Sequence, residues 1–417
     1  MMRERLLMIR NAACRACKGQ AMARFLSLGP QPPANAFLRK EELDKPEMAF
    51  PLDVYFCSGC SLVQLCDIVS PDLLFRNYVY VSSTSPSFVA HFRGFAQEIA
   101  ARFSLTPASL AVDIGSNDGI LLKPFRELGV RVLGVDPADK IAAAATADGI
   151  ETLPHFFTPA LAESILCDKR HASVITGTNV FAHVNDLDEL LGGVKILLEP
   201  EGVFIVEVPY LVDFLDKNLF DTVYHEHLSY FSVSSLHALF GRLGMRIFDV
   251  EKVGSHGGSL RVFVARKEAG RQTSQAVGRF MESERSRGLD SLPVYGEFAC
   301  RVEHNRAALK GLLRDLKSSG KKIAGYGAPA KGNTLLNYFG IGPETLDYIV
   351  DDSAWKQGLY TPGVHIPVVR AEQLHSRRPD YVLILAWNFA DPIMKNLAWF
   401  SGLGGKFIIP VPEARII

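Results

Sequence analysis

The segment Asp113-Ile114-Gly115-Ser116-Asn117-Asp118-Gly119 decides the fold of this chain. It follows a short apolar run at residues 110–115 and precedes a helical pattern at residues 119–128. A glycine-rich turn that joins a buried strand to a helix is typical of doubly wound α/β sheets, which bind their ligands at such turns. We therefore predict an α/β core that begins at residue 110.

The pattern around this turn alternates between strands and helices. Strands are expected at residues 110–115, 131–136, 151–157, 172–179, 202–209, 244–253 and 259–266, because each is a short apolar run rich in β-branched residues. Helices are expected at residues 119–128, 138–148, 158–169 and 187–198. The last two strands are joined by only five residues, 254–258, which predicts a hairpin and an antiparallel seventh strand. A Rossmann-like parallel sheet with this terminal hairpin is the plan of class I methyltransferases.

The turn favours S-adenosylmethionine (SAM) over a dinucleotide. NAD sites carry G-x-G-x-x-G, whereas here Asn117 replaces the middle glycine and an acid opens the motif. SAM has no pyrophosphate but carries an ammonium and a sulfonium group, which an acidic turn suits. Asp136, 21 residues after Gly115, is placed to bind ribose hydroxyls. A structural turn, with Phe156 and Asn179 as packing residues, is the alternative. The expected cofactor-binding residues are Asp113, Gly115, Ser116, Asp118, Gly119, Asp136, Pro137, Phe156 and Asn179.

Four of the seven cysteines form two pairs near the N-terminus, Cys14-x-x-Cys17 and Cys57-x-x-Cys60. Two such pairs can hold one tetrahedral Zn²⁺ and close its coordination shell, which predicts a structural metal. Free thiols or a redox pair are the alternatives, and Cys66 lacks a spaced partner. The flanking residues are not strongly basic, so a zinc ribbon that reads nucleic acid is not favoured.

Residues 210–231 follow the fifth strand and are expected to form an insertion at the carboxyl edge of the sheet, where such sheets build their sites. The insertion contains Tyr224-His225-Glu226-His227. In an extended segment His225 and His227 would share one face and Glu226 the other. A histidine beside a carboxylate suits a general base, because imidazole titrates near neutral pH. A hydrogen-bonded structural cluster and a His-x-His metal site are the alternatives.

The last third predicts two helices within residues 272–317, followed by a second α/β unit. The turn at residues 325–332 lies between a strand and a helix, where phosphate groups bind to a helix N-terminus. Lys331 would add a cation for a diphosphate, and a purely structural turn is the alternative. Strands are expected at 321–328, 345–351, 366–369, 380–386 and 406–410, helices at 331–339 and 391–400, and domains at 1–76, 77–268 and 269–417.

These motifs occur in the same order in the zinc-containing nucleotide-sugar C-methyltransferases, which this chain resembles over essentially its whole length. Residues 347–352 and 362–363 match as well. The resemblance implies a three-domain, usually monomeric enzyme of deoxysugar biosynthesis. It implies that the enzyme uses SAM to methylate C3 of a TDP-4-keto-deoxyhexose.

The resemblance also implies roles for individual residues. It implies that Cys14, Cys17, Cys57 and Cys60 hold Zn²⁺ and that His227 is the base. It places four further side chains around the sugar, namely Tyr78, Tyr224, Glu226 and His183. We expect additional substrate contacts from His225, Lys331 and Tyr326.

Composition limits the partners. At about 150 residues a domain, the 417 residues suggest about three domains. Lys and Arg number 45 and Asp and Glu number 45, so the net charge of zero favours a small-molecule partner over a nucleic acid. No apolar run is long enough to cross a membrane, so a cytoplasmic protein is expected. A sugar O- or N-methyltransferase, an RNA methyltransferase and a non-catalytic zinc scaffold are the alternative functions.

Overall fold

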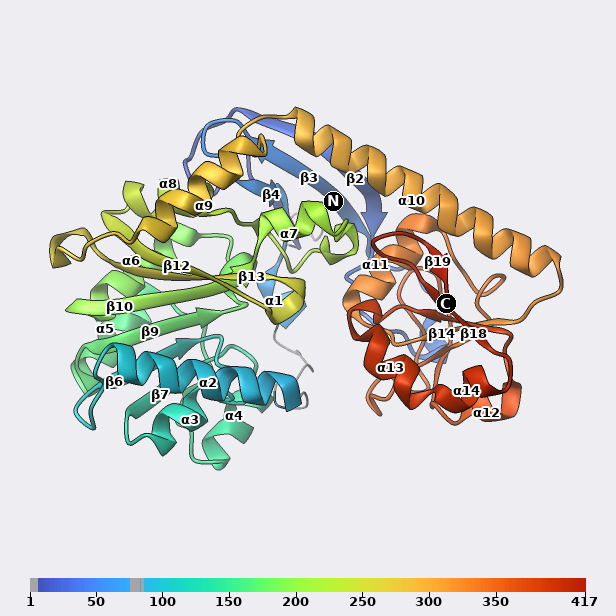
Figure 1. Cartoon of the computed structure of the whole chain (residues 1–417). Coiled ribbons are helices and arrows are strands. Elements are labelled where there is room, and N and C mark those ends of the chain that lie inside the picture. Colours follow the sequence, from blue (N-terminus) through green and yellow to red (C-terminus); the bar gives the residue numbers. More distant parts are fainter. Residues whose placement is uncertain (1–6, 76–82, 84–85) are drawn as a thin grey trace.

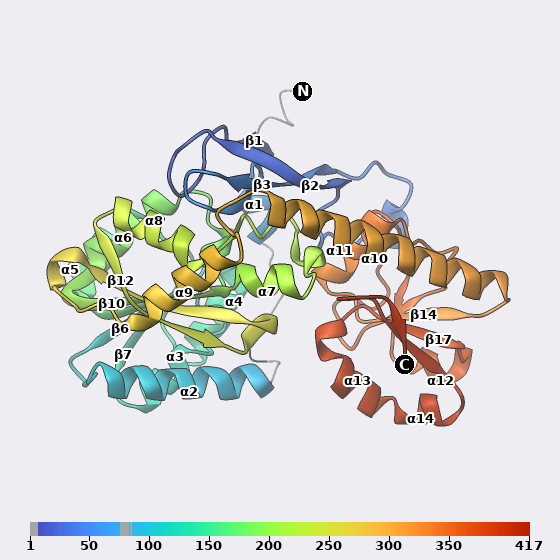
Figure 2. The same ribbon diagram turned by 45° about the horizontal axis from the view of Figure 1, so that its top comes forward.

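The computed structural model describes residues 7–75, 83 and 86–417. Two α/β lobes lie side by side, and an N-terminal β-sheet lies above the space between them (Figures 1 and 2). The long helix α10 (Pro293–Ser318) runs across the same end of the molecule and connects the two lobes. Among the described residues, no helix has the length and apolarity that a bilayer crossing requires.

The N-terminal sheet is antiparallel and takes one strand from a distant part of the chain. Its order is β11-β4-β3-β2, formed by Ser229–Tyr230, Val63–Leu65, Phe50–Cys57 and Met22–Gln31. A second pair joins β1 (Met8–Arg10) to β5 (Asp67–Val69). Because β11 belongs to the insertion after the fifth core strand, the N-terminal sheet fixes that insertion in place.

The central sheet has the order β8-β7-β6-β9-β10-β13-β12. Its strands are Thr152–Leu153, Arg131–Val135, Leu110–Ile114, Ala172–Thr178, Leu198–Pro209, Ser259–Arg266 and Met245–Val253. The first five strands pair in parallel, and β13 is antiparallel to both of its neighbours, so the predicted terminal hairpin is confirmed. The third strand is shorter than the expected 151–157, because Pro154 has no N–H to donate to the ladder.

Helices cover both faces of this sheet. Alternate residues of β10 point to opposite faces: Val203 and Ile205 pack under α2 (Pro86–Arg102), whereas Val206 belongs to the core under α6 (Leu187–Leu197). The helix expected at 119–128 begins later, since Asn117 and Gly119 have φ of +50° and +75°. The remaining helices of this region are α1 (Pro71–Phe75), α3 (Leu122–Glu127), α4 (Asp139–Ala147), α5 (Pro159–Lys169), α7 (Leu211–Asp216) and α8 (Val233–Arg242).

The C-terminal lobe follows α9 (Gln275–Ser286) and α10, and its sheet has the order β16-β15-β14-β17-β18-β19. The first five strands are parallel, and β19, which the sequence pattern did not predict, is antiparallel. The strands are Val368–Val369, Ile349–Val350, Ile323–Tyr326, Tyr381–Ile384, Lys406–Ile409 and Arg415–Ile416. The helices are α11 (Ala330–Phe339), α12 (Gln373–Arg377), α13 (Ala390–Asn396) and α14 (Ala398–Gly402).

Candidate active site

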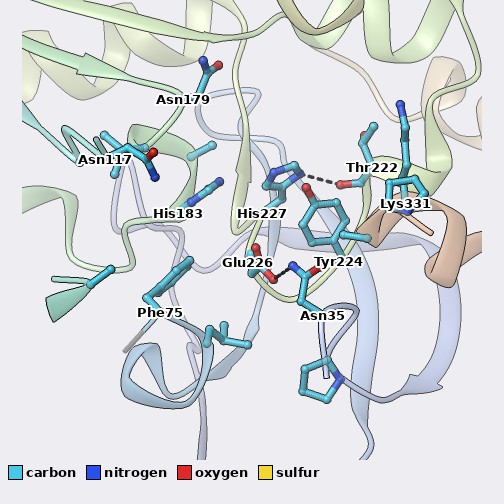
Figure 3. A pocket seen from close by; sticks show the side chains of 18 of the residues that line it. Asn35, Phe75, Asn117, Asn179, His183, Thr222, Tyr224, Glu226, His227 and Lys331 are labelled. Carbon is cyan, nitrogen blue, oxygen red and sulfur yellow. Dashed lines mark hydrogen bonds between the residues drawn. The ribbon is translucent and has the colours of Figure 1, made fainter. Parts of the chain in front are cut away.

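A cavity of about 2180 Å³ lies where the three parts of the chain meet. Its wall includes the carboxyl edge of the central sheet, the insertion, the N-terminal segment around Asn35 and the start of α11. Figure 3 shows Asn117 and Asn179 on one side of His227 and Lys331 on the other. The cavity therefore has two ends, which we call the sheet end (residues 113–117, 135–138 and 178–180) and the α11 end (residues 329–331 and 386–389).

The glycine turn forms the sheet end. Gly115 has φ of +71°, and a Cβ there would lie 2.7 Å from Cγ2 of Val180, so only glycine fits. Gly115 and Ser116 line the cavity, as does Asn117. Asp118 and Gly119 are not part of the cavity wall and instead shape the turn behind it.

Two carboxylates lie under this turn. Asp113 accepts a 2.6 Å hydrogen bond from Oγ1 of Thr176, and burial raises the pKa of Asp113 to about 7. Asp136 accepts hydrogen bonds of 2.9 Å from the backbone N–H groups of Asn117 and Ala138, and burial raises its pKa as well. Asp136, which was expected to bind the ribose hydroxyls of the cofactor, thus also holds the glycine turn in place.

The sheet end has polar atoms that suit a polar ligand such as SAM. Oγ of Ser116 and Oδ1 of Asn179 are buried and have no hydrogen-bond partner among the described residues. Buried polar atoms are normally paired, so both are available to a bound molecule. Pro137 lines the same end, and Phe156, which remains 36% exposed, also lines the cavity. The residues expected to bind SAM therefore suit such a ligand, except Asp118 and Gly119, which lie behind the cavity wall.

The Tyr224–His227 segment is a turn, closed by a 2.8 Å hydrogen bond from His227 N–H to the Tyr224 carbonyl. The segment is therefore not extended, and the shared face that an extended chain would give to His225 and His227 does not apply. His225 lies away from the cavity, where Nε2–H donates to the carbonyl oxygen of Phe50 at 3.2 Å. Burial lowers the pKa of His225 to about 4, so the ring is neutral. The structure thus corrects the prediction that His225 contacts substrate.

His227 lies in the middle of the cavity wall. Its Nδ1 is 2.8 Å from the Thr222 carbonyl oxygen, which can only accept, so Nδ1 carries the hydrogen and Nε2 carries the lone pair of the neutral ring. Its ring lies 4.0 Å from that of Tyr224 and 5.0 Å from that of His183. His183 in turn stacks on Phe75 at 5.6 Å. Figure 3 shows this row of rings.

Glu226 lies on the wall beside His227 and is only 4% exposed. Its Oε1 accepts a 2.7 Å hydrogen bond from Nδ2 of Asn35, a residue of the N-terminal segment. Burial raises the pKa of Glu226 to about 7, so both protonation states are populated near neutral pH. Asn35 and Thr222 were not among the predicted site residues, and no local motif marks either of them.

Lys331 forms the α11 end. Its ammonium lies 4.3 Å from the ring centre of Trp387 and contacts Asn388. Burial lowers the pKa of Lys331 to about 8, while the carboxylate of Asp221 opposes that shift. Tyr326 does not reach the wall: its hydroxyl donates to Asp352 at 3.0 Å, which corrects its expected role in substrate contact. Tyr78 and Tyr80 lie outside the described residues.

The four predicted cysteines converge. The Sγ atoms of Cys14, Cys17, Cys57 and Cys60 all lie within 4.8 Å of one another, and the described part of the chain contains no other candidate group of metal ligands. Cys14 and Cys60 are 3.5 Å apart and Cys17 and Cys57 3.6 Å apart. Zn–S bonds of about 2.3 Å at tetrahedral angles place sulfurs about 3.8 Å apart, so the cluster fits Zn²⁺.

Arg15, between two of these cysteines, connects the metal cluster to the site. Its buried guanidinium donates to the carbonyl oxygen of Leu228 at 2.9 Å and to that of Leu65 at 3.0 Å. It also reaches Oδ1 of Asn185 at 3.3 Å. Leu228 follows His227 directly, so the zinc cluster supports the turn that carries His227. The sequence pattern did not single out Arg15.

Comparisons with known proteins match three consecutive parts of the chain. Family models described as "Putative zinc binding domain", "Methyltransferase domain" and "C-methyltransferase C-terminal domain" match residues 14–75, 89–250 and 254–412. The chain is 42% identical over 404 residues to the C-methyltransferase NovU of Streptomyces niveus, covering 97% of this chain and 96% of that protein.

Two further matches cover less of the chain. A ubiquinone biosynthesis O-methyltransferase of Rhodopseudomonas palustris (strain HaA2) is 34% identical over 96 residues, which are 23% of this chain and 38% of that protein. The crystal structure of the glycopeptide N-methyltransferase MtfA has a TM-score of 0.34 at 14% identity, over 41% of this chain and 94% of its own.

The sheet order, the cavity turn and the methyltransferase match together define a SAM-dependent methyltransferase with a zinc-binding domain. The near full-length similarity to NovU then places the chain in a narrower group: it belongs to the family of zinc-containing C-methyltransferases. The predictions of the family, the fold, SAM and zinc are confirmed.

Proposed function

We propose that this enzyme removes the C3 proton of a nucleotide-linked 4-keto-deoxysugar, TDP-linked by resemblance, and methylates C3. The observation that carries the proposal is the hydrogen bond from Nδ1 of His227 to the Thr222 carbonyl, which leaves the lone pair on Nε2. A fixed tautomer on a cavity wall is what a general base requires. The chain's similarity to NovU, a C-methyltransferase by name, supports carbon as the acceptor.

The proton on C3 is a weak acid even beside the C4 ketone, so the site must also stabilise the enolate oxygen. Tyr224 and Glu226 adjoin His227 on the cavity wall. We assign them as the hydrogen-bond donors, with Glu226 acting in its protonated form, which its raised pKa makes available. Tyr78 and His183 remain proposed sugar contacts. When bound, SAM supplies an electrophilic methyl group to the carbanion equivalent at C3.

The α11 end is proposed to bind the nucleotide diphosphate. Lys331 offers a cation at the first turn of α11, where a helix N-terminus also attracts anions. Trp387 gives an aromatic face beside it. With the nucleotide there and SAM at the sheet end, the sugar ring would lie near His227, between the two ends (Figure 3).

The test is incubation with methyl-¹³C SAM and a panel of TDP-linked sugars, with and without a 4-keto group. We expect a methyl group bonded to C3, identified by carbon–proton correlation NMR, only with the keto sugars. His227→Asn should give no product, and His375→Asn, at an exposed ring stacked on Trp399, is the matched control. A methyl group on oxygen or nitrogen, or transfer to sugars without the ketone, contradicts the proposal.

A further inference from the structure

The segment from Ala34 to Glu47 belongs to the zinc-binding part of the chain and contacts the C-terminal lobe at three points. Nδ2 of Asn333 donates to the Ala34 carbonyl at 2.7 Å. Leu38 and Tyr360 exchange backbone hydrogen bonds of 3.0 and 2.8 Å. The Glu47 carboxylate accepts the N–H of Gly363 at 3.0 Å. This segment, which we call the 34–47 strap, therefore connects two domains.

Asn35 is the residue of the strap that reaches the proposed catalytic turn. It lines the cavity, and its Nδ2 donates to Oε1 of Glu226 at 2.7 Å. The neighbouring carbonyl, that of Ala34, is the one held by Asn333. Two short hydrogen bonds in succession thus join α11 to Glu226.

The other end of this connection is close to the proposed diphosphate contact. Asn333 is fully buried and lies two positions after Lys331 on the same helix. Lys331 faces the cavity, whereas the Asn333 amide holds the strap. A ligand that contacts Lys331 therefore contacts the same helical turn that anchors the strap.

Glu226 depends on this one amide. None of the described residues forms an ion pair with it, and burial and the Asn35 hydrogen bond are the two influences on its pKa. The other titratable residues of its own turn are Tyr224, His225 and His227, and no charged group is among the influences on its pKa. Without Asn35, the carboxyl group would be buried with no side-chain hydrogen-bond donor among the described residues, and it would rotate and keep its proton more tightly.

We propose that Asn35 is a positioning residue that sets the orientation and protonation of Glu226, and that Asn333 couples this function to the C-terminal lobe. This inference rests on the proposed function, because that proposal is what gives Glu226 a role in turnover. It makes the C-terminal lobe part of the catalytic arrangement as well as a binding surface. A substrate that docks on α11 then finds the carboxyl group already oriented.

The kinetic test compares three variants with the wild type. Asn35→Ala and Asn35→Leu should each lower kcat at least about tenfold while KM changes less than about threefold, because Glu226 keeps its proton but loses its orientation. Asn35→Leu keeps the approximate size of the side chain but removes the donor, so wild-type kcat in that variant overturns the proposal. Asn333→Ala should lower kcat less, and the loss should not add to that of Asn35→Ala. Full additivity of the two losses overturns the coupling.

The second measurement needs no substrate. The carboxyl stretch of Glu226 is obtained by infrared difference against the same protein carrying Glu226→Gln, and its titration midpoint is followed with pH. Asn35→Ala should raise the midpoint by about one unit or more. Asn305→Ala, which removes a buried amide that donates to the Pro410 carbonyl, is the control and should lower Tm without moving the midpoint.

The two proposals fail in different ways. A folded Asn35→Ala protein with an unmoved midpoint, or an equal shift in Asn305→Ala, overturns the role of Asn35. A wild type that methylates none of the keto sugars overturns the proposed function, and the infrared midpoint still decides the role of Asn35.

Discussion

The two ends of the cavity are built in different ways. At the sheet end, Gly115, Ser116 and Asn117 are consecutive, and Asp136 directly follows the neighbouring strand β7. Around His227 the parts come from far apart: Asn35 and Glu226 are 191 positions apart, and Arg15 and Leu228 are 213 apart. The sheet end is thus a local turn on one sheet, whereas the turn that carries His227 is held in place by side chains of the N-terminal domain. We therefore expect that a substitution at one of these two places impairs the function of that place and leaves the other intact.

The largest effect is expected at His227. His227→Ala and His227→Asn should lower kcat by about 10²- to 10⁴-fold, the usual contribution of a general base. Calorimetric SAM affinity should stay within about twofold, because the sheet end is intact. A variant that loses SAM binding together with turnover would contradict the separation of the two ends.

Gly115→Ala should impair SAM binding at the sheet end. Its positive φ costs an alanine about 1–2 kcal/mol, and the contact with Val180 adds to this, so SAM affinity should fall about tenfold or more. C3 proton exchange without SAM should continue at the wild-type rate. Gly115→Ala with Val180→Ala relieves the contact and should recover part of the affinity; no recovery would show that the contact is not the cause.

Arg15→Met tests whether the region of the zinc cluster supports the turn that carries His227. The variant leaves the Leu65 carbonyl without its Arg15 donor, at a cost of about 1–3 kcal/mol, and removes one of the two donors of the Leu228 carbonyl, which keeps the N–H of Leu65. We expect a lower Tm and slower C3 exchange, with zinc content by elemental analysis still one per chain. Arg24→Met, which breaks an exposed ion pair with Asp53, is the control and should change neither.

The smallest effect concerns pH at the α11 end. The pKa of Lys331 is lowered to about 8, so the side chain is charged below that pH and loses its charge as pH rises through it. KM for a diphosphate substrate should therefore rise above pH 8, by about threefold to tenfold. Lys331→Arg keeps the charge and should abolish this rise. A KM that stays flat to pH 9.5 in the wild type would remove Lys331 as the diphosphate contact.

The same contrast explains what the sequence could predict. The glycine turn, Asp136 and the cysteine quartet are local patterns, and the structure brings each set together as expected. His225 was misassigned because the segment forms a turn, which an alternation rule for extended chain cannot reveal. Asn35 and Arg15 were missed because their role comes from partners in other domains, and a single asparagine or arginine carries no local signal.

The most direct measurement of the central claim is the exchange of the C3 proton of a TDP-4-keto-deoxyhexose in D₂O without SAM, followed by proton NMR. Wild-type enzyme should remove the C3 proton signal, and His227→Asn should leave it at the uncatalysed rate. Exchange by His227→Asn at the wild-type rate would contradict the assignment of His227 as the base.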